Sequence, residues 1–331
     1  SRSLCFFIGR RGTGKTAITY YVASRNSQAL SIHPQVLDPL LFPLPTESLR
    51  DTRARPFRSL VEVFQRAVLD EVISELLRTG KLREGQLPPV LNRELRYARD
   101  YDFDLRVLEF LQEVCAPLDK GDERKWLKEI GQAKKIAHAM GEVVPPTVSH
   151  KVLIDRIDDS WDGSDVAVVM LMALMHSCIE ISQYTDVVRP LLFLRENIFD
   201  RVRQIDPEST RLETCVVSMD WTDELLKEMI ERRLVEPFNT KLPVRGPTWE
   251  YFFEGGDCGS AQAAIFDYCQ RRPRDVLTYC DFALQIARSK NHERILLGDV
   301  LDARCRFSES RLKDLGDEYS ENFPQIALVL S

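Results

Sequence analysis

The sequence predicts an α/β fold in which a parallel sheet carries a large helical insertion and is followed by an all-helical C-terminal domain. Short apolar runs alternate with helical patterns, as in a sheet whose parallel strands are joined by crossover helices. A stretch at about 47–146 lies between two of these runs and has helical periodicity. Beyond Trp221 the pattern is helical only. We therefore expect a core at 1–221, a helical lid domain at 222–304 and a connecting tail at 305–331.

The predicted sheet begins at Leu4–Ile8, a short apolar run of the kind that a buried parallel strand shows. Gly9 closes this run, and a helix opens at Gly14. Ser164 is the expected N-cap of a second, strongly apolar helix. The apolar run in that helix is too short to span a bilayer, so we expect no membrane segment. Further strands are expected at Ala29–His33, Val152–Ile154, Pro190–Leu194 and Cys215–Met219.

The helices of the insertion and of the C-terminal domain are predicted from i, i+3, i+4 periodicity. In the insertion, one amphipathic helix covers Leu60–Leu77, and two more are expected around Leu105–Val114 and Arg124–Met140. In the C-terminal domain, Thr222 is placed to cap one helix, because acidic residues follow it in the first turn. Pro273 is placed to begin another helix, at the position that proline tolerates.

The composition narrows the class of protein. A chain of 331 residues with 44% apolar and 29% charged residues can bury an α/β core and a smaller helical domain. The formal charge of −6 provides no overall positive field for nucleic acid, so such binding would need a local basic patch. Eight cysteines include no CxxC pair and no Cys/His ligand spacing, which favours reduced thiols in a cytoplasmic protein.

The strongest motif is GRRGTGKT at Gly9–Thr16, which matches G-x-x-x-x-G-K-[ST], follows a predicted strand and opens a helix. Backbone N–H groups in such a loop can wrap phosphates, and the helix N-terminus adds a favourable dipole. Lys15 would reach the β- and γ-phosphates, and the Thr16 hydroxyl would bind magnesium. The sequence therefore predicts a P-loop NTPase sheet that binds ATP with Mg²⁺. The predicted nucleotide-binding residues are Gly9, Arg10, Arg11, Gly12, Thr13, Gly14, Lys15 and Thr16.

A second motif, VLIDRIDD at Val152–Asp159, carries acids at the end of a predicted strand. A carboxylate there is costly unless a cation or donors satisfy it, so we assign Asp155 to magnesium together with Thr16. Asp158 and Asp159 follow, where one can orient or deprotonate the attacking water while the other stays ionised. An acidic loop or a helix cap is the alternative interpretation of this pair.

Two arginines are candidate sensors of the γ-phosphate. Arg195 ends the strand in PLLFLRENI, at the edge of an open parallel sheet where ligands bind. The alternative role for Arg195 is a salt bridge to Glu196 or to the acidic cluster. RRPRD at Arg271–Asp275 begins a helix of the C-terminal domain, where Pro273 and Arg274 can face a nucleotide. A surface basic turn is the alternative for that segment.

Together these motifs resemble the bacterial signal-transduction ATPases of the STAND and AAA+ type found in antiviral conflict systems. The similarity includes FLRENIFD, the W-x-x-x-x-L-x-x-M-I-x-x-R-L helix at Trp221–Leu234, and RPRD. In that family a core and a helical lid clamp ATP, and the nucleotide state controls oligomerisation, which activates a fused or associated effector. The resemblance implies that Lys15 and Thr16 are the P-loop pair, Asp155 the magnesium ligand, Arg195 the first sensor and Pro273–Arg274 the lid sensor.

The chain departs from the family in two places. Arg156 stands where many AAA+ proteins have a catalytic Glu, and Asp159 stands where the family often has Glu, so slow hydrolysis is expected. The insertion lies outside the common core, and we assign it to partner or sensor contacts. We therefore expect a slowly hydrolysing ATP switch that self-associates or controls an effector. A nucleotide-gated scaffold, a replication-initiator-like ATPase associated with DNA and a P-loop kinase are the alternatives, whereas the lack of N-K-x-D disfavours a GTPase.

Overall fold

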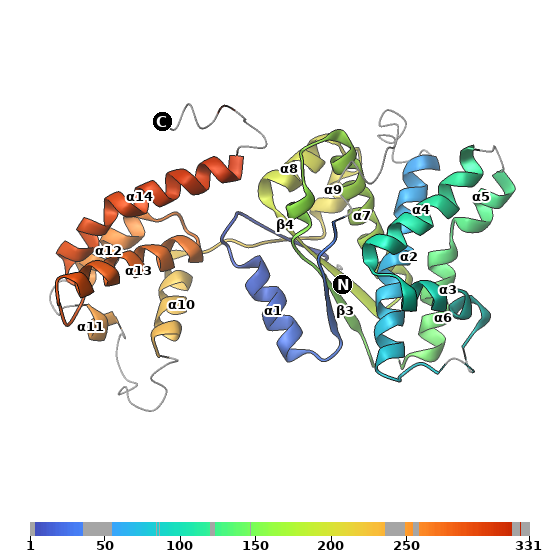
Figure 1. The fold of residues 1–331 in the computed structure, drawn as a ribbon, viewed down its shortest axis with the longest axis horizontal. Helices are drawn as coiled ribbons and strands as arrows, with labels where there is room; N and C mark the ends of the chain where they lie inside the picture. Colours follow the sequence, from blue (N-terminus) through green and yellow to red (C-terminus); the bar gives the residue numbers. More distant parts are fainter. Residues whose placement is uncertain are drawn as a thin grey trace. The chain divides into compact units, whose positions relative to one another are not determined.

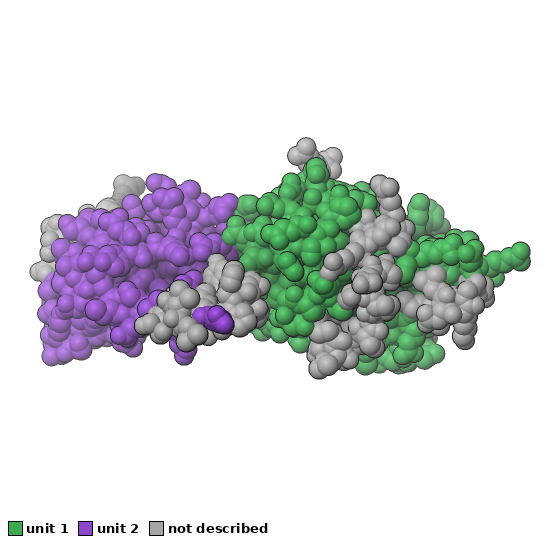
Figure 2. Space-filling model, turned by 90° about the horizontal axis from the view of Figure 1, so that it is seen from above, with its two compact units in different colours: residues 1–9, 15–218 green, residues 10–14, 219–331 purple. Residues whose placement is uncertain are grey.

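The chain folds into two compact units, which Figure 2 colours separately. The sheet unit comprises residues 1–9 and 15–218, and the helical unit comprises residues 10–14 and 219–331. The prediction of an α/β core followed by an all-helical domain is confirmed. The structure, a computed structural model, describes residues 4–35, 55–83, 85, 87–119, 123–145, 147–235, 249–253, 258–319 and 325.

The strands of the sheet unit form one parallel sheet in the order β2-β3-β4-β1-β5. Its central strands are largely buried, which explains why they are continuous apolar runs and not alternating ones. In the register, Gly9 pairs with Arg195 and Ile154 pairs with Leu192. The carboxyl ends of β1, β3 and β4 therefore meet at one edge. The strands are β1 (Phe6–Gly9), β2 (Ala29–Ile32), β3 (His150–Ile154), β4 (Val188–Arg195) and β5 (Val216–Ser218).

Helices of the sheet unit cover the sheet. The first, α1 (Lys15–Arg25), packs against β2 and β4, and α8 (Glu196–Ile205) packs against β1 and β4. A short helix, α9 (Ser209–Glu213), precedes β5. The apolar helix α7 (Asp165–Tyr184) begins as predicted, because the Ser164 hydroxyl accepts a hydrogen bond from the backbone N–H of Ala167 at 3.1 Å.

By length and composition, α7 could cross a membrane, and it is the one helix in the described part of the chain that passes this test. In this structure, 89% of its most apolar window is buried within the protein. It packs against α2 (Arg55–Arg78) and β4, so its apolar surface is covered by other elements of the sheet unit.

The predicted insertion is helical and gathers on one side of the sheet (Figure 1). The helix expected at Arg124–Met140 is two helices in the structure. Gly131 has a left-handed φ of 90° and interrupts the helical conformation between them. It also adds a helix that begins at Pro89, which was not separately predicted. Residues 47–54, 84, 86, 120–122 and 146 of the expected insertion lie outside the described residues. The helices are α2, α3 (Pro89–Asp100), α4 (Phe103–Asp119), α5 (Glu123–Glu129) and α6 (Gln132–Val143).

The helical unit has its own core, in which Trp249, Tyr279 and Phe307 are buried. The expected caps are present, since Thr222 accepts a hydrogen bond from Leu225 N–H at 3.3 Å and Pro273 is the first residue of α13. The expected boundary at 304/305 is not seen, because α14 runs through it and buries Phe307. The described helices are α10 (Asp223–Val235), α11 (Trp249–Phe252), α12 (Cys258–Tyr268), α13 (Pro273–Ser289) and α14 (Leu297–Tyr319).

Two further boundaries differ from the expectation. The two units divide between Ser218 and Met219, three residues before the expected end of the core at 221, and the loop residues Arg10–Gly14 group with the helical unit. Within the expected tail, residues 320–324 and 326–331 lie outside the described residues.

Candidate functional site

The glycine loop joins β1 to α1, as the motif predicts. Gly9 is the last residue of β1 and is buried, and Lys15 and Thr16 are the first two residues of α1. The Lys15 ammonium donates a hydrogen bond to the Gly9 carbonyl at 2.7 Å, so the side chain folds back along the loop. The first turn of α1 contains no acidic residue. The helix N-terminus therefore keeps its preference for an anion.

Asp155 follows β3 and is 3% exposed. The backbone of Asp155 continues the pairing with β2, because its N–H donates to the Ile32 carbonyl at 3.1 Å. Its carboxylate accepts a hydrogen bond from the Thr19 hydroxyl at 3.4 Å. Thr19 lies one turn after Lys15 on α1, so the predicted magnesium ligand lies against the helix that the loop opens. A buried carboxylate with one long hydrogen bond is suited to a hard cation.

Arg195 and Asp158 form an ion pair in which both side chains are largely buried, 16% and 13% exposed. Asp158 and Asp159 lie in a 3-10 turn, Ile157–Ser160, directly after β3. Of the two interpretations of Arg195, the structure shows the salt bridge to the acidic cluster. Asp159 is exposed and does not share this pair.

Arg156 adopts a left-handed conformation, with φ of 60°, and its side chain is exposed. Its carbonyl accepts a hydrogen bond from Asp159 N–H at 3.0 Å, which closes the turn after β3. A left-handed conformation is uncommon for a residue other than glycine, asparagine or aspartate, and such outliers cluster at functional sites. The residue that directly follows Asp155 is therefore an exposed cation.

Within the helical unit, residues 10–14 of the loop lie against the start of α13. Arg274 N–H donates to the Gly12 carbonyl at 3.3 Å, and the Arg272 guanidinium donates to the Arg11 carbonyl at 3.2 Å. The Trp221 indole donates to the Thr13 carbonyl at 2.9 Å. Gly12 has φ of +86°, and a Cβ there would lie 2.9 Å from the Arg274 Cβ, so only glycine fits this contact.

The side chain of Arg274 is partly exposed, and its pKa is lowered. Partial burial and the neighbouring positive charge of Arg11 lower the pKa of Arg274. Its guanidinium makes no hydrogen bond or ion pair with any described residue, in contrast to that of Arg272. A cation that forms no ion pair within the described part of the chain and lies beside a second arginine is suited to bind an anion.

The helical unit matches a known family. Residues 224–316 match the family described as the FunZ-associated C-terminal helical domain, a range that covers α10–α14 almost completely and passes the expected boundary at 304. The match does not extend to the glycine loop.

Two curated proteins share weaker similarity with the chain. A putative transposon gamma-delta 80.3 kDa protein of Escherichia coli strain K12 is 27% identical over 182 residues, which are 54% of this chain and 26% of that protein. The allergen Alt a 2 of Alternaria alternata is 27% identical over 141 residues, which are 42% of this chain and 74% of the allergen. The chain thus spans about a quarter of the length of the transposon protein.

Each predicted site residue lies at the end of a strand, in the loop or turn that follows a strand, or at the start of a helix. Those of the sheet unit are Gly9, Lys15, Thr16, Asp155, Asp158, Asp159 and Arg195; those of the helical unit are Arg10, Arg11, Gly12, Thr13, Gly14, Pro273 and Arg274. Sequence reasoning missed the roles of Thr19, Trp221 and Arg272. Thr19 could have been found from its four-residue spacing after Lys15, which places both on one face of α1. No local signal marks Trp221 or Arg272 as a partner of a loop carbonyl.

Proposed function

We propose that this protein is a molecular switch that binds ATP with Mg²⁺ at Gly9–Thr16 and hydrolyses it slowly. The observation that carries this proposal is that the loop and its helix are joined to a buried carboxylate, since Thr19 of α1 holds Asp155. Lys15 would contact the β- and γ-phosphates, and the carboxylate of Asp155 and the hydroxyl of Thr16 are hard oxygen ligands that fit Mg²⁺. When bound, magnesium would neutralise phosphate charge.

The helical unit supports the same proposal. The loop residues that would wrap the phosphates lie against the start of α13, so Arg274 is already beside them. A γ-phosphate would supply the anionic partner that Arg274 lacks within the described residues. Because ADP has no γ-phosphate, this contact would distinguish the two nucleotides and make the bound state depend on hydrolysis.

Slow hydrolysis is supported by the side chains after β3. Asp158 is neutralised by Arg195, and Arg156 is a cation at the position that a catalytic Glu would need. Asp159 is the exposed carboxylate left to orient water. A switch that turns over slowly remains long enough in its ATP state to assemble or to activate an effector.

The biological setting that we propose is conflict with mobile elements, antiviral defence included. The similarity of α10–α14 to a FunZ-associated helical domain, and of about half of the chain to a transposon protein, supports this setting. The transposon similarity also favours a second candidate, an ATPase that acts in association with DNA. Binding to duplex DNA that weakens steeply with salt would support this candidate.

The decisive experiment is ATP binding by calorimetry to wild-type protein and to Lys15→Ala. We expect Lys15→Ala to weaken ATP binding by about 10- to 100-fold, because charge-assisted hydrogen bonds to phosphate are lost. The Lys15 ammonium donates to the carbonyl of Gly9, and circular dichroism and urea unfolding of the variant check that the fold remains. Lys135→Ala, on the exposed face of α6, is the matched control. Equal ATP affinity in folded Lys15→Ala would reject the nucleotide site, and labelled-ATP product analysis would separate hydrolysis from phosphate transfer.

A further inference from the structure

A buried carboxylate in the helical unit links two arginines that come from different segments. Asp275, the third residue of α13, is 1% exposed. One carboxylate oxygen accepts hydrogen bonds from Arg272 Nε at 3.2 Å and Nη2 at 3.1 Å. The other accepts from Arg311 Nη1 of α14 at 2.7 Å. Both oxygens of Asp275 are thus used by guanidinium groups.

The contacts continue in both directions. Beyond Arg272, its Nη1 donates to the Arg11 carbonyl in the glycine loop at 3.2 Å. Beyond Arg311, its Nη2 pairs with Asp314 at 3.0 Å, one turn further along α14. An unbroken series of charge-assisted hydrogen bonds therefore leads from the loop backbone through Asp275 to α14.

A helix-capping role does not account for these contacts. An acid in the first turn of α13 is favoured by the helix dipole, and that would require no partner from elsewhere. Arg311, however, is 36 residues away in the sequence, and it reaches a carboxylate that is buried in the unit. Asp275 and both arginines also line a cavity of about 280 Å³, which leaves room for a guanidinium to change partners.

We propose that Asp275 is a positioning residue that couples the glycine loop to α14. This inference rests on the proposed function, in which phosphates bind the N–H groups of the loop. Reorientation of those peptides would move the Arg11 carbonyl, which is an acceptor for Arg272. Because Arg272 and Arg311 share one carboxylate, a new position of Arg272 changes the geometry at Arg311. The part of α14 around Asp314 then responds to the state of the loop.

The test is hydrogen–deuterium exchange of the full chain, measured at the loop amides 10–14 and at α14. In the first arm no nucleotide is present. Arg311→Gln is then expected to raise exchange of the loop amides several-fold, although the ion pairs of Arg311 within the described residues are with Asp275 and Asp314 and not with the loop. In the second arm ATP and Mg²⁺ are added. Wild-type α14 should change its protection, whereas Arg311→Gln should bind ATP with near wild-type affinity and show no such change.

Two further variants control this experiment. Arg306→Gln is also on α14 but contacts Gln285 and lies over the Phe282 ring, so both responses should stay as in wild type. Arg311→Lys keeps the positive charge opposite Asp275 and should restore part of both responses. If Arg311→Gln proves unstable in urea, Arg311→Lys alone carries the comparison with Arg306→Gln.

The outcomes separate the coupling from the nucleotide site. Loop amides that exchange at the wild-type rate in Arg311→Gln and in Asp275→Asn would overturn the coupling, whatever ATP does. An α14 response to ATP that persists in Arg311→Gln would overturn it as well. If wild-type protein binds no ATP while the loop still responds to Arg311→Gln, the proposed function fails and the coupling stands.

Discussion

At the scale of single residues, the pairing of Arg195 with Asp158 determines what each side chain can do. Arg195 is expected to sense a γ-phosphate and Asp158 to act on water, yet each neutralises the other here. The register places Arg195 opposite Gly9, at the first residue of the loop. A γ-phosphate at the loop would therefore compete with Asp158 for the guanidinium. This competition predicts opposite effects of removing the two partners.

We expect Asp158→Asn to increase the preference for ATP over ADP and Arg195→Ala to decrease it. Each change should be about 5- to 30-fold, the value of one partly exposed charge-assisted contact of about 1–2 kcal/mol. Binding of both nucleotides to each variant measures this preference. Arg203→Ala removes a half-exposed ion pair on α8 and should change neither affinity. If both variants weaken ATP and ADP alike, the pair is structural and Arg195 is no sensor.

The neighbouring arginines of α13 allow a matched comparison. Arg274→Ala should lower ATP affinity by about 10-fold and leave ADP affinity near wild type, because the contact would be made with the γ-phosphate only. Arg271→Ala removes a cation three residues earlier that is 69% exposed and pairs with Asp223, so it should affect neither nucleotide. Competition binding measures the ATP and ADP affinities of both variants. If the two variants have the same affinities, Arg274 is a surface residue that does not contact the γ-phosphate.

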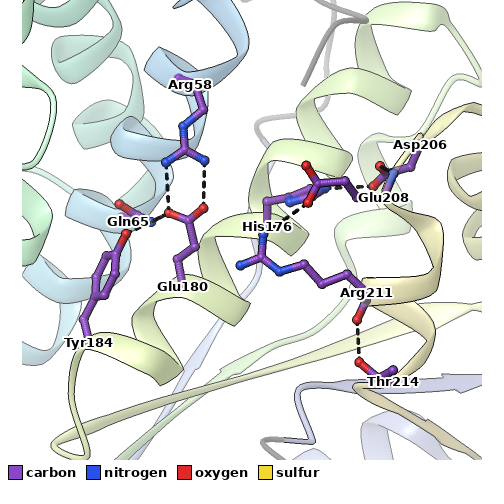
Figure 3. Close-up of polar contacts among 9 residues, drawn as sticks. All are labelled: Arg58, Gln65, His176, Glu180, Tyr184, Asp206, Glu208, Arg211 and Thr214. Atoms are coloured by element: carbon purple, nitrogen blue, oxygen red, sulfur yellow. Dashed lines mark hydrogen bonds and ion pairs between the residues drawn. The ribbon is translucent and has the colours of Figure 1, made fainter. Parts of the chain in front are cut away.

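At the scale of elements, a charged cluster joins α2 to α7. Figure 3 shows Arg58, Gln65 and Tyr184 directed at Glu180 of α7. The Glu180 carboxylate accepts three hydrogen bonds, from Arg58 at 2.8 Å, from Gln65 at 2.7 Å and from Tyr184 at 3.0 Å. Burial alone would raise the pKa of Glu180, but the hydrogen bond and charge of Arg58, together with the hydrogen bonds from Tyr184 and Gln65, outweigh burial, so that the pKa is lowered. The carboxylate is thus held in its ionised form between two packed helices.

Glu180→Gln should therefore reduce the free energy of unfolding at pH 7 by about 1–2 kcal/mol, a value reduced because Arg58 is 40% exposed. The contribution of a carboxyl with a lowered folded pKa is complete above its unfolded pKa of about 4.3 and is lost as the pH falls through the folded value. Urea unfolding from pH 7 to pH 3 should accordingly show a smaller acid-dependent loss in Glu180→Gln than in wild type. Glu142→Gln, at an exposed pair on α6, should behave as wild type, and parallel curves for all three proteins would contradict the assignment.

At the scale of the whole molecule, the proposed switch mechanism predicts that the populations of the protein's conformational or assembly states follow the bound nucleotide. Replacing Asp158 and Asp159 with Asn keeps their size and removes the carboxylates available to activate water. With ATP, this variant should remain as a larger or more compact species for longer than wild type in time-resolved scattering, and ADP should produce no such species. Asp155→Asn is the contrasting variant, since it should weaken magnesium-dependent binding. A doublet variant that hydrolyses ATP at the wild-type rate would reject the mechanism.

Much of the architecture could be predicted from local sequence. The apolar runs identified the strands, and Ser164, Thr222 and Pro273 marked helix starts that the structure confirms, because caps and strand burial depend on neighbouring residues. The boundaries of helices and domains were predicted less accurately. Gly131 interrupts a periodic stretch that was expected to be one helix, and α14 continues through the boundary expected at 304/305. Its continuation depends on the burial of Phe307 in the core of the helical unit, which a helical pattern alone does not show.

By itself, the sequence determined that a glycine loop lies between a buried strand and a helix, and that acids and an arginine follow two further strands. These are properties of short segments, and strand ends in a parallel sheet necessarily share one edge. Only the tertiary structure decided the partners: Thr19 with Asp155, Asp158 with Arg195, and Asp275 with Arg311. The physical reason is that the residues around a charged side chain in the sequence do not determine which distant residue it will contact. Chain crossovers and helix packing bring distant side chains within hydrogen-bond distance, and burial then makes the pairing energetically important.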